Sequence, residues 1–248
     1  MTTKTTAKAT KANGRAKAKS NGAKSKAPTN RLTAKEKSIV VEGRQVVIPK
    51  PNFQTGEFKI IGNAPYCQNK FSKKAKDQIK ATQEGGSTST KGKKRDPKDF
   101  QACYEQAIHK STEGWYGIPA PAFRNAMISA CKTVGFFMTK GKQCLFCVAD
   151  GIDADDGTPL VKITKGKPEY SEHCVRPEKG GVDIRPRPMW PPGWEATVTL
   201  KYDADQFTLS DIANLLMRVG VQVGVGEGRP DSPKSCGMGW GTFDLQDK

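Results

Sequence analysis

Long apolar runs are missing from this sequence. No stretch approaches the ~20 apolar residues that span a bilayer, and no apolar segment follows the basic N-terminus as in a secretory signal. We therefore expect no membrane anchor. The seven cysteines are an odd number scattered over predicted helices and strands. This distribution favours a reducing, intracellular and cytoplasmic setting over a disulfide framework.

Signatures of catalysis are equally scarce. The sequence has no Gly-Lys-Ser/Thr phosphate loop, no G-x-S-x-G, no H-E-x-x-H and no carboxylate cluster of the nuclease type. Only His109 and His173 are available as imidazoles. We therefore expect a non-enzymatic protein with no cofactor and no metal.

Acidic residues are nearly absent where basic residues gather. The chain has 248 residues and a net charge of +16. Residues 1–37 carry eleven Lys/Arg and one acid, for a net charge of +10, and residues 70–98 carry ten Lys/Arg and three acids, for +7. The remainder is thus nearly neutral, at −1. Basic charge concentrated in this way predicts a polyanionic partner, most commonly nucleic acid.

Both basic segments have the composition of flexible chain. Between Met1 and Leu32 there is no aliphatic residue larger than alanine, so residues 1–37 are predicted to be a disordered tail that contacts a polyanion or, alternatively, only solubilises the protein. Residues 70–98 are predicted to be a basic, flexible insertion with a helix over 72–83. Residues 38–248 are then one domain around this insertion.

Periodicity predicts an α+β domain. Strands are expected over 38–48, 58–61, 142–149, 159–164, 195–202, 221–225 and 239–245, helices over 100–109, 120–133 and 209–219, and irregular chain over 165–193. The helix over 120–133 carries an apolar stripe at i, i+3, i+4 and i+7, and Thr208–Asp211 predicts a capping box. The element order is close to the βαββαβ arrangement of ferredoxin-like and RRM-like domains, here with insertions.

Two motifs stand out in the sequence. One is GIPAPAFRNA at 117–126, and the other is the glycine-rich GVGEGRP at 224–230 with GMGWGTF at 237–243. Together they resemble the RAMP superfamily, the RRM-like backbone proteins of CRISPR effector complexes, although Arg124-Asn125 stands in place of that family's Lys-Gly. A basic tail joined to a compact domain also resembles phage-encoded accessory proteins. The resemblance implies an RRM-like fold that binds a nucleic-acid strand; the glycines alone are equally consistent with tight turns in a C-terminal hairpin.

From these patterns we predict that the chain binds single-stranded nucleic acid, RNA or DNA. The candidate contacts are Lys73, Lys74, Lys76, Lys91, Lys93, Lys94 and Arg95 of the basic segment; Arg124, Arg185, Arg187 and Arg229; Trp190; and Gly226, Gly228, Gly237 and Gly239 of the glycine-rich loop. Arginines would pair with phosphates and a tryptophan would stack a base. Trp190 and Trp194 have the alternative interpretation of core residues.

Other functions stay open at this point. Ribonucleases related to the superfamily use a histidine as general base, so the resemblance makes His109 a weak catalytic candidate in a metal-free endoribonuclease; the alternative is a surface histidine. A third hypothesis is a self-associating packaging or assembly protein, with copies forming a homo-oligomer along a strand. Asp153, Asp155 and Asp156 lack the calcium-loop spacing and predict a hairpin turn. Cys144 and Cys147, with His173 and Cys174, have zinc-like spacing but are more typical of a buried strand.

Overall fold

The computed structural model describes residues 49–84, 97–175, 182–233 and 237–246. The predicted tail, the predicted strands over 38–48, and Lys91, Lys93, Lys94 and Arg95 lie outside these residues. Lys50–Lys248 form one compact unit by their internal contacts. The fold is α+β with antiparallel sheets, as predicted.

The main sheet has the strand order of a ferredoxin-like domain. Its strands are β1 (Phe53–Gly62), β3 (Gly117–Pro119), β4 (Leu145–Val148), β5 (Gly151–Ile152), β6 (Pro159–Lys165), β9 (Glu195–Asp203) and β10 (Phe243–Leu245). They run in the order β10-β1-β9-β6-β3, while β4 pairs with β9 and β5 with β6. The short strands β4 and β6 pair with different parts of β9 and share the place of the second strand. The order is therefore 4-1-3-2 in terms of the βαββαβ unit.

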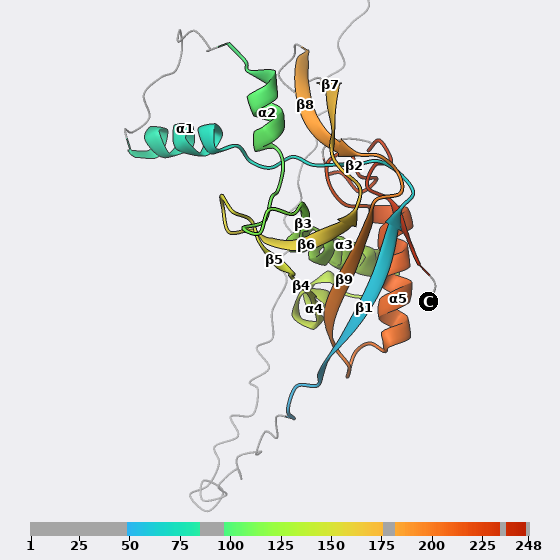
Figure 1. Cartoon of the computed structure of the whole chain (residues 1–248). Coiled ribbons are helices and arrows are strands. Elements are labelled where there is room, and N and C mark those ends of the chain that lie inside the picture. Colours follow the sequence, from blue (N-terminus) through green and yellow to red (C-terminus); the bar gives the residue numbers. More distant parts are fainter. Residues whose placement is uncertain (1–48, 85–96, 176–181, 234–236, 247–248) are drawn as a thin grey trace, which may run out of the picture. The chain divides into compact units, whose positions relative to one another are not determined.

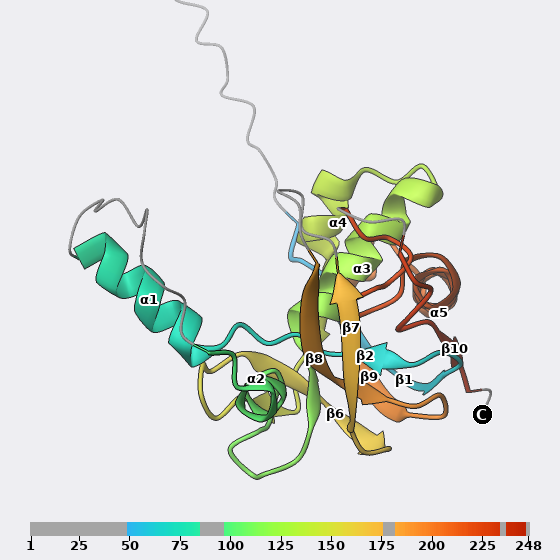
Figure 2. The ribbon, with the colours of Figure 1, turned by 90° about the horizontal axis from the view of Figure 1, so that it is seen from above.

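Three helices cover one face of this sheet, and the other face is open (Figures 1 and 2). They are α3 (Ala120–Thr133), α4 (Met138–Cys144) and α5 (Leu209–Arg218). The predicted stripe of α3 is buried: Phe123, Ala126, Met127 and Ala130 all face the core. The capping box of Thr208 and Asp211 begins α5. The alternating side chains of β9 bury Ala196, Val198, Leu200 and Tyr202 beneath these helices.

A second, three-stranded sheet corrects the prediction of irregular chain over 165–193. It consists of β2 (Tyr66–Cys67), β8 (Asp183–Trp190) and β7 (Glu169–Val175), in that order. Helix α2 (Phe100–Gln106) lies beside β8 (Figure 1), and Tyr104 stacks on Tyr170 with ring centroids 5.2 Å apart. The predicted helix over 72–83 is confirmed as α1 (Lys73–Glu84).

Two further predictions about elements are wrong. The expected strand over 142–149 begins as α4, and its β4 portion pairs with β9 instead of forming a hairpin with β6; the strand joined to β6 by the turn is β5. The expected strand over 221–225 falls on a π-helical turn, Val219–Val223, that continues α5. The amide of Gly224 donates to the carbonyl of Val219 at 2.7 Å and closes this wide turn.

Candidate functional site

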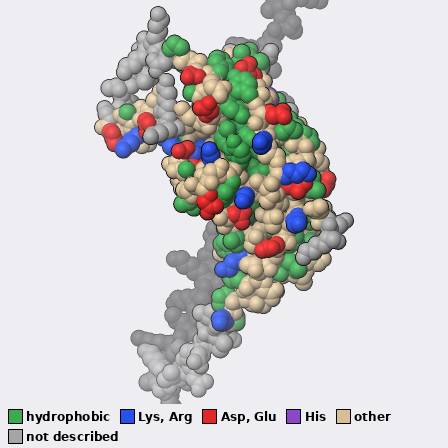
Figure 3. All heavy atoms as spheres, viewed as in Figure 1, with side chains coloured by type: hydrophobic (Ala, Val, Ile, Leu, Met, Phe, Trp, Pro, Cys, Tyr) green, Lys and Arg blue, Asp and Glu red, His purple; other side chains and the backbone are tan. Residues whose placement is uncertain are grey.

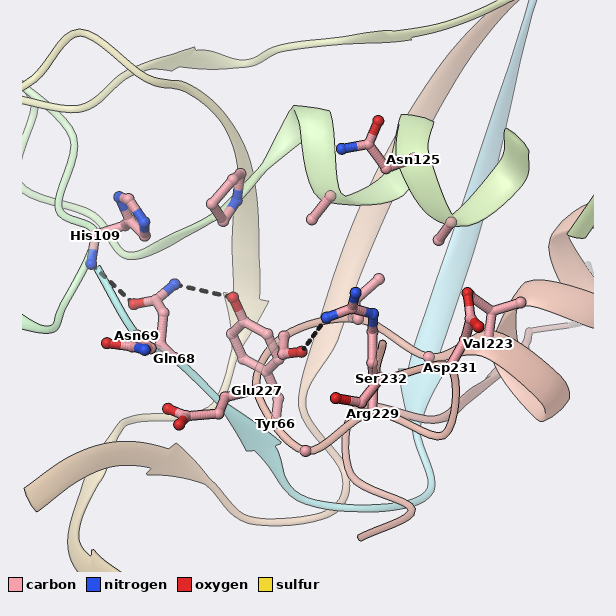
Figure 4. Close-up of a pocket in the computed structure, with 17 residues that line it drawn as sticks. Tyr66, Gln68, Asn69, His109, Asn125, Val223, Glu227, Arg229, Asp231 and Ser232 are labelled. Carbon is pink, nitrogen blue, oxygen red and sulfur yellow. Dashed lines mark hydrogen bonds between the residues drawn. The ribbon is translucent and has the colours of Figure 1, made fainter. Parts of the chain in front are cut away.

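A polar pocket lies between the N-terminal half of α3 and the glycine-rich loop. Its volume is about 520 Å³. Figure 4 shows how three segments surround it: the chain after β2, helix α3 and the loop that follows the π-helical turn. The polar lining residues are Tyr66, Gln68, Asn69, His109, Asn125, Glu227, Arg229, Asp231 and Ser232. The pocket therefore joins both motifs that carried the family resemblance.

His109 is held at the pocket wall by two polar contacts. Its Nδ1 lies 2.8 Å from Oδ2 of Asp153, and its backbone N–H donates to Oε1 of Gln68 at 2.8 Å. Gln68 is itself buried, and its Nε2 donates to the hydroxyl of Tyr66 and the carbonyl of Gly117. Asp153, in the turn before β6, thus orients the imidazole, while Gln68, in the β2–α1 connection, holds the backbone of His109.

Burial lowers the pKa of His109, and the nearby carboxylate of Asp153 opposes this effect without reversing it. The ring is therefore neutral at pH 7. Because ionised Asp153 only accepts hydrogen bonds, Nδ1 carries the proton and Nε2 is an acceptor. Nε2 has no hydrogen-bond partner among the described residues.

Asp153 is the centre of a buried charged network. Lys70 Nζ lies 2.6 Å from Oδ1 of Asp153 and 2.6 Å from Oδ2 of Asp155. The same Oδ1 accepts the backbone N–H groups of Asp155 and Asp156. Burial raises the pKa of Asp153, but the ammonium of Lys70 and these hydrogen bonds bring it below its usual range. Asp153 is thus an ionised turn residue, in agreement with the turn interpretation.

The same cluster has the geometry of a metal-binding group. Ligand atoms of His109, Asp153 and Asp156 lie within 4.8 Å of one another, the only such trio in the described part of the chain. The ammonium of Lys70 already contacts Asp153 and neutralises it. Lys70 and Lys76 thus pair with the carboxylates of this group. The zinc alternative through Cys144, Cys147, His173 and Cys174 brings together no such cluster among the described residues.

The glycine-rich loop folds closely on itself. A Cβ at Gly226 would lie 2.5 Å from the carbonyl of Cys67, and one at Gly228 would lie 2.4 Å from the Trp240 ring. Both residues also have positive φ, 85° and 76°. Their glycine identity is required by the packing of the loop, which agrees with the tight-turn interpretation. Gly237 and Gly239 are further left-handed positions of this loop.

The structure places the predicted arginines in existing contacts. Arg124 donates to the carbonyls of Leu145 at 3.0 Å and Lys142 at 2.6 Å, and Arg185 pairs with Asp183. Arg187 pairs with Glu227 of the glycine-rich loop, while Arg229 donates to the carbonyl of Gly226 at 3.2 Å. Of these four, Arg229 alone lines the pocket.

Trp190 corrects the prediction of an exposed stacking residue. Its relative exposure is 0%, because its ring packs against Tyr66 and Tyr116 at centroid distances of 5.4 and 5.9 Å. Trp194 is also fully buried, and its Nε1 donates to the carbonyl of Ala64. The alternative interpretation of both tryptophans as core residues is therefore correct, and neither ring face is available to a base.

The basic segment begins at the pocket. Asn69 lines the pocket, Lys70 pairs with Asp153, and α1 starts three residues later with Lys73 and Lys74. Lys76 lies 3.2 Å from Asp156 and attaches the first turn of α1 to the same turn. Neither Gln68, Asn69, Asn125 nor Asp153 was predicted as a site residue. Only Asn125 lay within a recognised motif.

Comparisons with known proteins leave the family open. No family model matches the chain, and no curated protein matches it. One solved structure that matches is a chain in the cryo-EM structure of the Type III-B Cmr-beta bound to cognate target RNA, at 12% identity and a TM-score of 0.43. The match covers 79% of this chain and 60% of that one, so the chain corresponds to about three fifths of that protein's length. Assignment to the RAMP superfamily remains a prediction from the two motifs.

No helix in the described part of the chain is long and apolar enough to cross a membrane.

Proposed function

We propose that the chain is a non-enzymatic binding protein for single-stranded nucleic acid. The observation that carries this proposal is the junction at Gln68–Lys73, where the polar pocket ends and the basic segment begins. A strand seated in the pocket would continue along the lysines of α1. The pocket offers amide and imidazole groups suited to base edges, and α1 offers charges suited to phosphates.

Charge partition supports the same function. The two basic segments together hold 21 of the 41 Lys/Arg residues, whereas the rest of the chain is close to neutral. When lysines of such segments contact phosphates, they displace counterions from the nucleic acid, and this displacement raises the affinity in a salt-dependent way. The pocket itself contains Glu227 and Asp231 beside Arg229. We therefore assign orientation of the strand to the pocket and most of the affinity to the basic segments.

The test compares binding of single-stranded RNA, single-stranded DNA and duplex DNA by fluorescence anisotropy. Asn69→Ala with Asn125→Ala should weaken single-strand binding roughly 3- to 10-fold, as expected for about 1 kcal/mol of lost hydrogen bonding. Asn214→Ala, which removes an exposed amide from α5, is the matched control. If the native chain bound duplex and single strands with equal affinity, and the double variant kept that affinity, the pocket would have no role in binding.

The His109–Asp153 pair favours one second candidate, a metal-free endoribonuclease. A neutral imidazole whose Nδ1–H is held by a carboxylate presents Nε2 as a base. Nε2 would take the proton of a ribose 2′-hydroxyl, whose oxygen attacks the adjacent phosphate while the 5′-oxygen leaves and is protonated by solvent. This candidate predicts that the native chain cleaves RNA in the presence of EDTA. The cleavage should be lost in His109→Ala, and also when the nucleotide before the cleaved bond lacks its 2′-hydroxyl. Cleavage that persists in His109→Ala would eliminate it.

A further inference from the structure

The first half of β1 has an open edge. β9 pairs with nearly the whole length of β1, whereas β10, on the other side, reaches only Ile60–Gly62. The amide of Ala204 donates to the carbonyl of Asn52 at 2.8 Å, one residue before β1 begins. In an antiparallel ladder such bonds recur at every second residue. The even-numbered residues of β1 therefore bond to β9, and the odd-numbered residues direct their N–H and C=O groups outward.

The outward groups of this edge belong to Phe53, Thr55 and Glu57. No described residue forms a hydrogen bond with their backbone groups. At the next outward position, the carbonyl of Lys59 accepts the backbone N–H of Gln246 at 2.9 Å, and this bond closes the edge. The free edge is therefore about five residues long and can pair with one short strand.

A groove of about 880 Å³ runs along the free edge. Its walls are formed by Thr55–Lys59 of β1, the beginning of α5 and the end of β10. Leu209 of α5 is 52% exposed, and a Cβ at Gly56 would lie only 2.6 Å from its Cδ1. Glycine at position 56 thus lets this leucine lie directly against the strand. The groove combines unpaired backbone groups with an apolar wall, which is what an extended peptide needs.

The charges of the groove favour a peptide over nucleic acid. Glu57 and Lys59 are the charged residues of its lining, one of each sign, and neither forms an ion pair within the described part of the chain. On the side of the molecule that shows β1 in Figure 1, basic and acidic side chains lie interspersed (Figure 3). Nucleic acid binds to clustered basic residues, so this groove is better suited to a strand with one charge opposite to Glu57.

The sequence just before β1 has the composition of such a strand. Residues 44–48 read RQVVI, and three of these five residues are β-branched. An antiparallel ladder that places Arg44 opposite Glu57 also places Ile48 opposite Phe53. Opposite charges and two apolar side chains then face each other across the ladder, and both kinds of pair stabilise a sheet. Shifted registers lose the charge pair.

The link between this segment and β1 disfavours a hairpin within one molecule. Such a hairpin would leave Pro49-Lys50-Pro51-Asn52 as a four-residue loop. Loops of this length are most often built around a type I turn, whose central residues are close to helical conformation. Lys50 precedes a proline, and this disfavours the helical conformation and favours an extended one. The segment is therefore better placed to reach the edge of another molecule.

We infer that residues 44–48 of one copy add as a strand to the Phe53–Glu57 edge of a second copy. Backbone hydrogen bonds hold the copies together, and the Arg44–Glu57 pair determines the register. Exchange of identical segments is a known route to self-association. The groove and the polar pocket share no lining residue, so this contact does not depend on the proposed function. Joined copies present several basic segments to one nucleic-acid strand, which increases avidity.

The test measures association of the full chain by light scattering over a range of concentrations, without nucleic acid. Arg44→Glu and Glu57→Arg are studied separately and as an equimolar mixture. Each variant alone places like charges opposite each other in the exchanged ladder, whereas the mixture restores opposite charges between the two kinds of molecule. Arg31→Glu and Glu105→Arg, alone and mixed, are the matched controls, because they change the net charge equally outside the ladder.

We expect the native chain and the controls to associate as concentration rises, each of the two variants to associate roughly tenfold more weakly, and their mixture to recover native association. Recovery in the mixture also shows that both variants are folded. A native chain that stays monomeric at every concentration would overturn the inference. So would a mixture that associates no better than its components, because the segment would then pair with the edge of its own molecule or with neither.

Discussion

Lys70 and Asp153 are a buried ion pair between residues far apart in the sequence. Their side chains are 4% and 0% exposed. Each charge is compensated by the other, and Asp153 also accepts hydrogen bonds from His109 and the turn. Such a pair adds little net stability compared with apolar residues, but removal of one partner leaves the other charge buried and unpaired.

Lys70→Met should therefore destabilise the protein by about 3 kcal/mol. The measurement is the free energy of unfolding from urea denaturation at pH 7. Lys76→Met is the control, since the Lys76–Asp156 pair has a half-exposed lysine and should cost less than about 1 kcal/mol. Equal effects of the two substitutions would show that the buried network is not a major contribution to stability.

His109 predicts a dependence of stability on pH. Burial lowers its pKa in the folded state below the value of about 6.5 in the unfolded chain. The unfolded chain then binds more protons as pH falls below 6.5, so the stability is complete above this pH and is lost as pH falls toward the folded-state pKa. Asp153, Lys70 and Asp156 are the charged groups that act on the ring.

The measurement compares the free energy of unfolding at pH 7.5 and 5.5. His109→Asn keeps a donor toward Asp153 but does not titrate, so its loss of stability between the two pH values should be smaller than that of the native chain. His173 also has a pKa lowered by burial, and its contribution is the same in both proteins. An identical pH dependence in native chain and variant would contradict a buried neutral His109.

At the scale of elements, the π-helical turn Val219–Val223 packs closely against β10. A Cβ at Gly220 would lie 2.0 Å from the carbonyl oxygen of Phe243 in β10. Gly220→Ala should therefore cost more than about 2 kcal/mol, because a backbone atom cannot move aside as a side chain does. Val221→Ala, at a position 65% exposed, should change stability little. Thermal unfolding of the two variants distinguishes these outcomes.

The sequence predicted those elements in which the spacing of apolar residues itself marks the buried face. Examples are the apolar stripe of α3 and the alternating apolar residues of β9. The strands β7 and β8 were missed, since Pro186 and Pro188 are typical of irregular chain. The carbonyl of Pro188 accepts the backbone N–H of Gln68, so Pro188 faces the β2 side of β8. Pro186, two residues earlier, faces the same side, where β2 pairs only with Met189 and Trp190. The missing N–H groups of both prolines therefore lie along an edge that is only partly paired.

The site was predicted only in part for a related reason. The two motifs indicated the loop and the start of α3, and these do line the pocket. Asp153 was interpreted correctly as a turn residue, but its contact with His109 joins positions 44 apart, and no local pattern encodes that. Trp190 was misplaced because it follows Arg185 and Arg187 in a proline-rich segment, whereas its partners Tyr66 and Tyr116 come from other elements.

At the scale of the whole molecule, the charge partition predicts how binding responds to salt. In the native chain the logarithm of the binding constant should fall linearly with the logarithm of salt concentration, with a slope of about −0.7 for each phosphate neutralised on a single strand. A full-length variant with the eleven basic residues of 1–37 changed to glutamine should show a shallower slope and retain a preference for single strands. If that variant bound nothing at any salt concentration, the folded domain would have no role in binding.

The position of β1 has a consequence for synthesis of the chain. β1 pairs only with β9 and β10 among the described strands, and about 130 residues separate the end of β1 from the start of β9. At translation rates of roughly 5–20 residues per second, β1 is made some 7 to 26 s before its first partner. During that interval both of its edges are open to strands of other molecules. Production of intact protein is therefore expected to depend on chaperones that bind nascent chains, and to improve at lower temperature, where competing aggregation is slower.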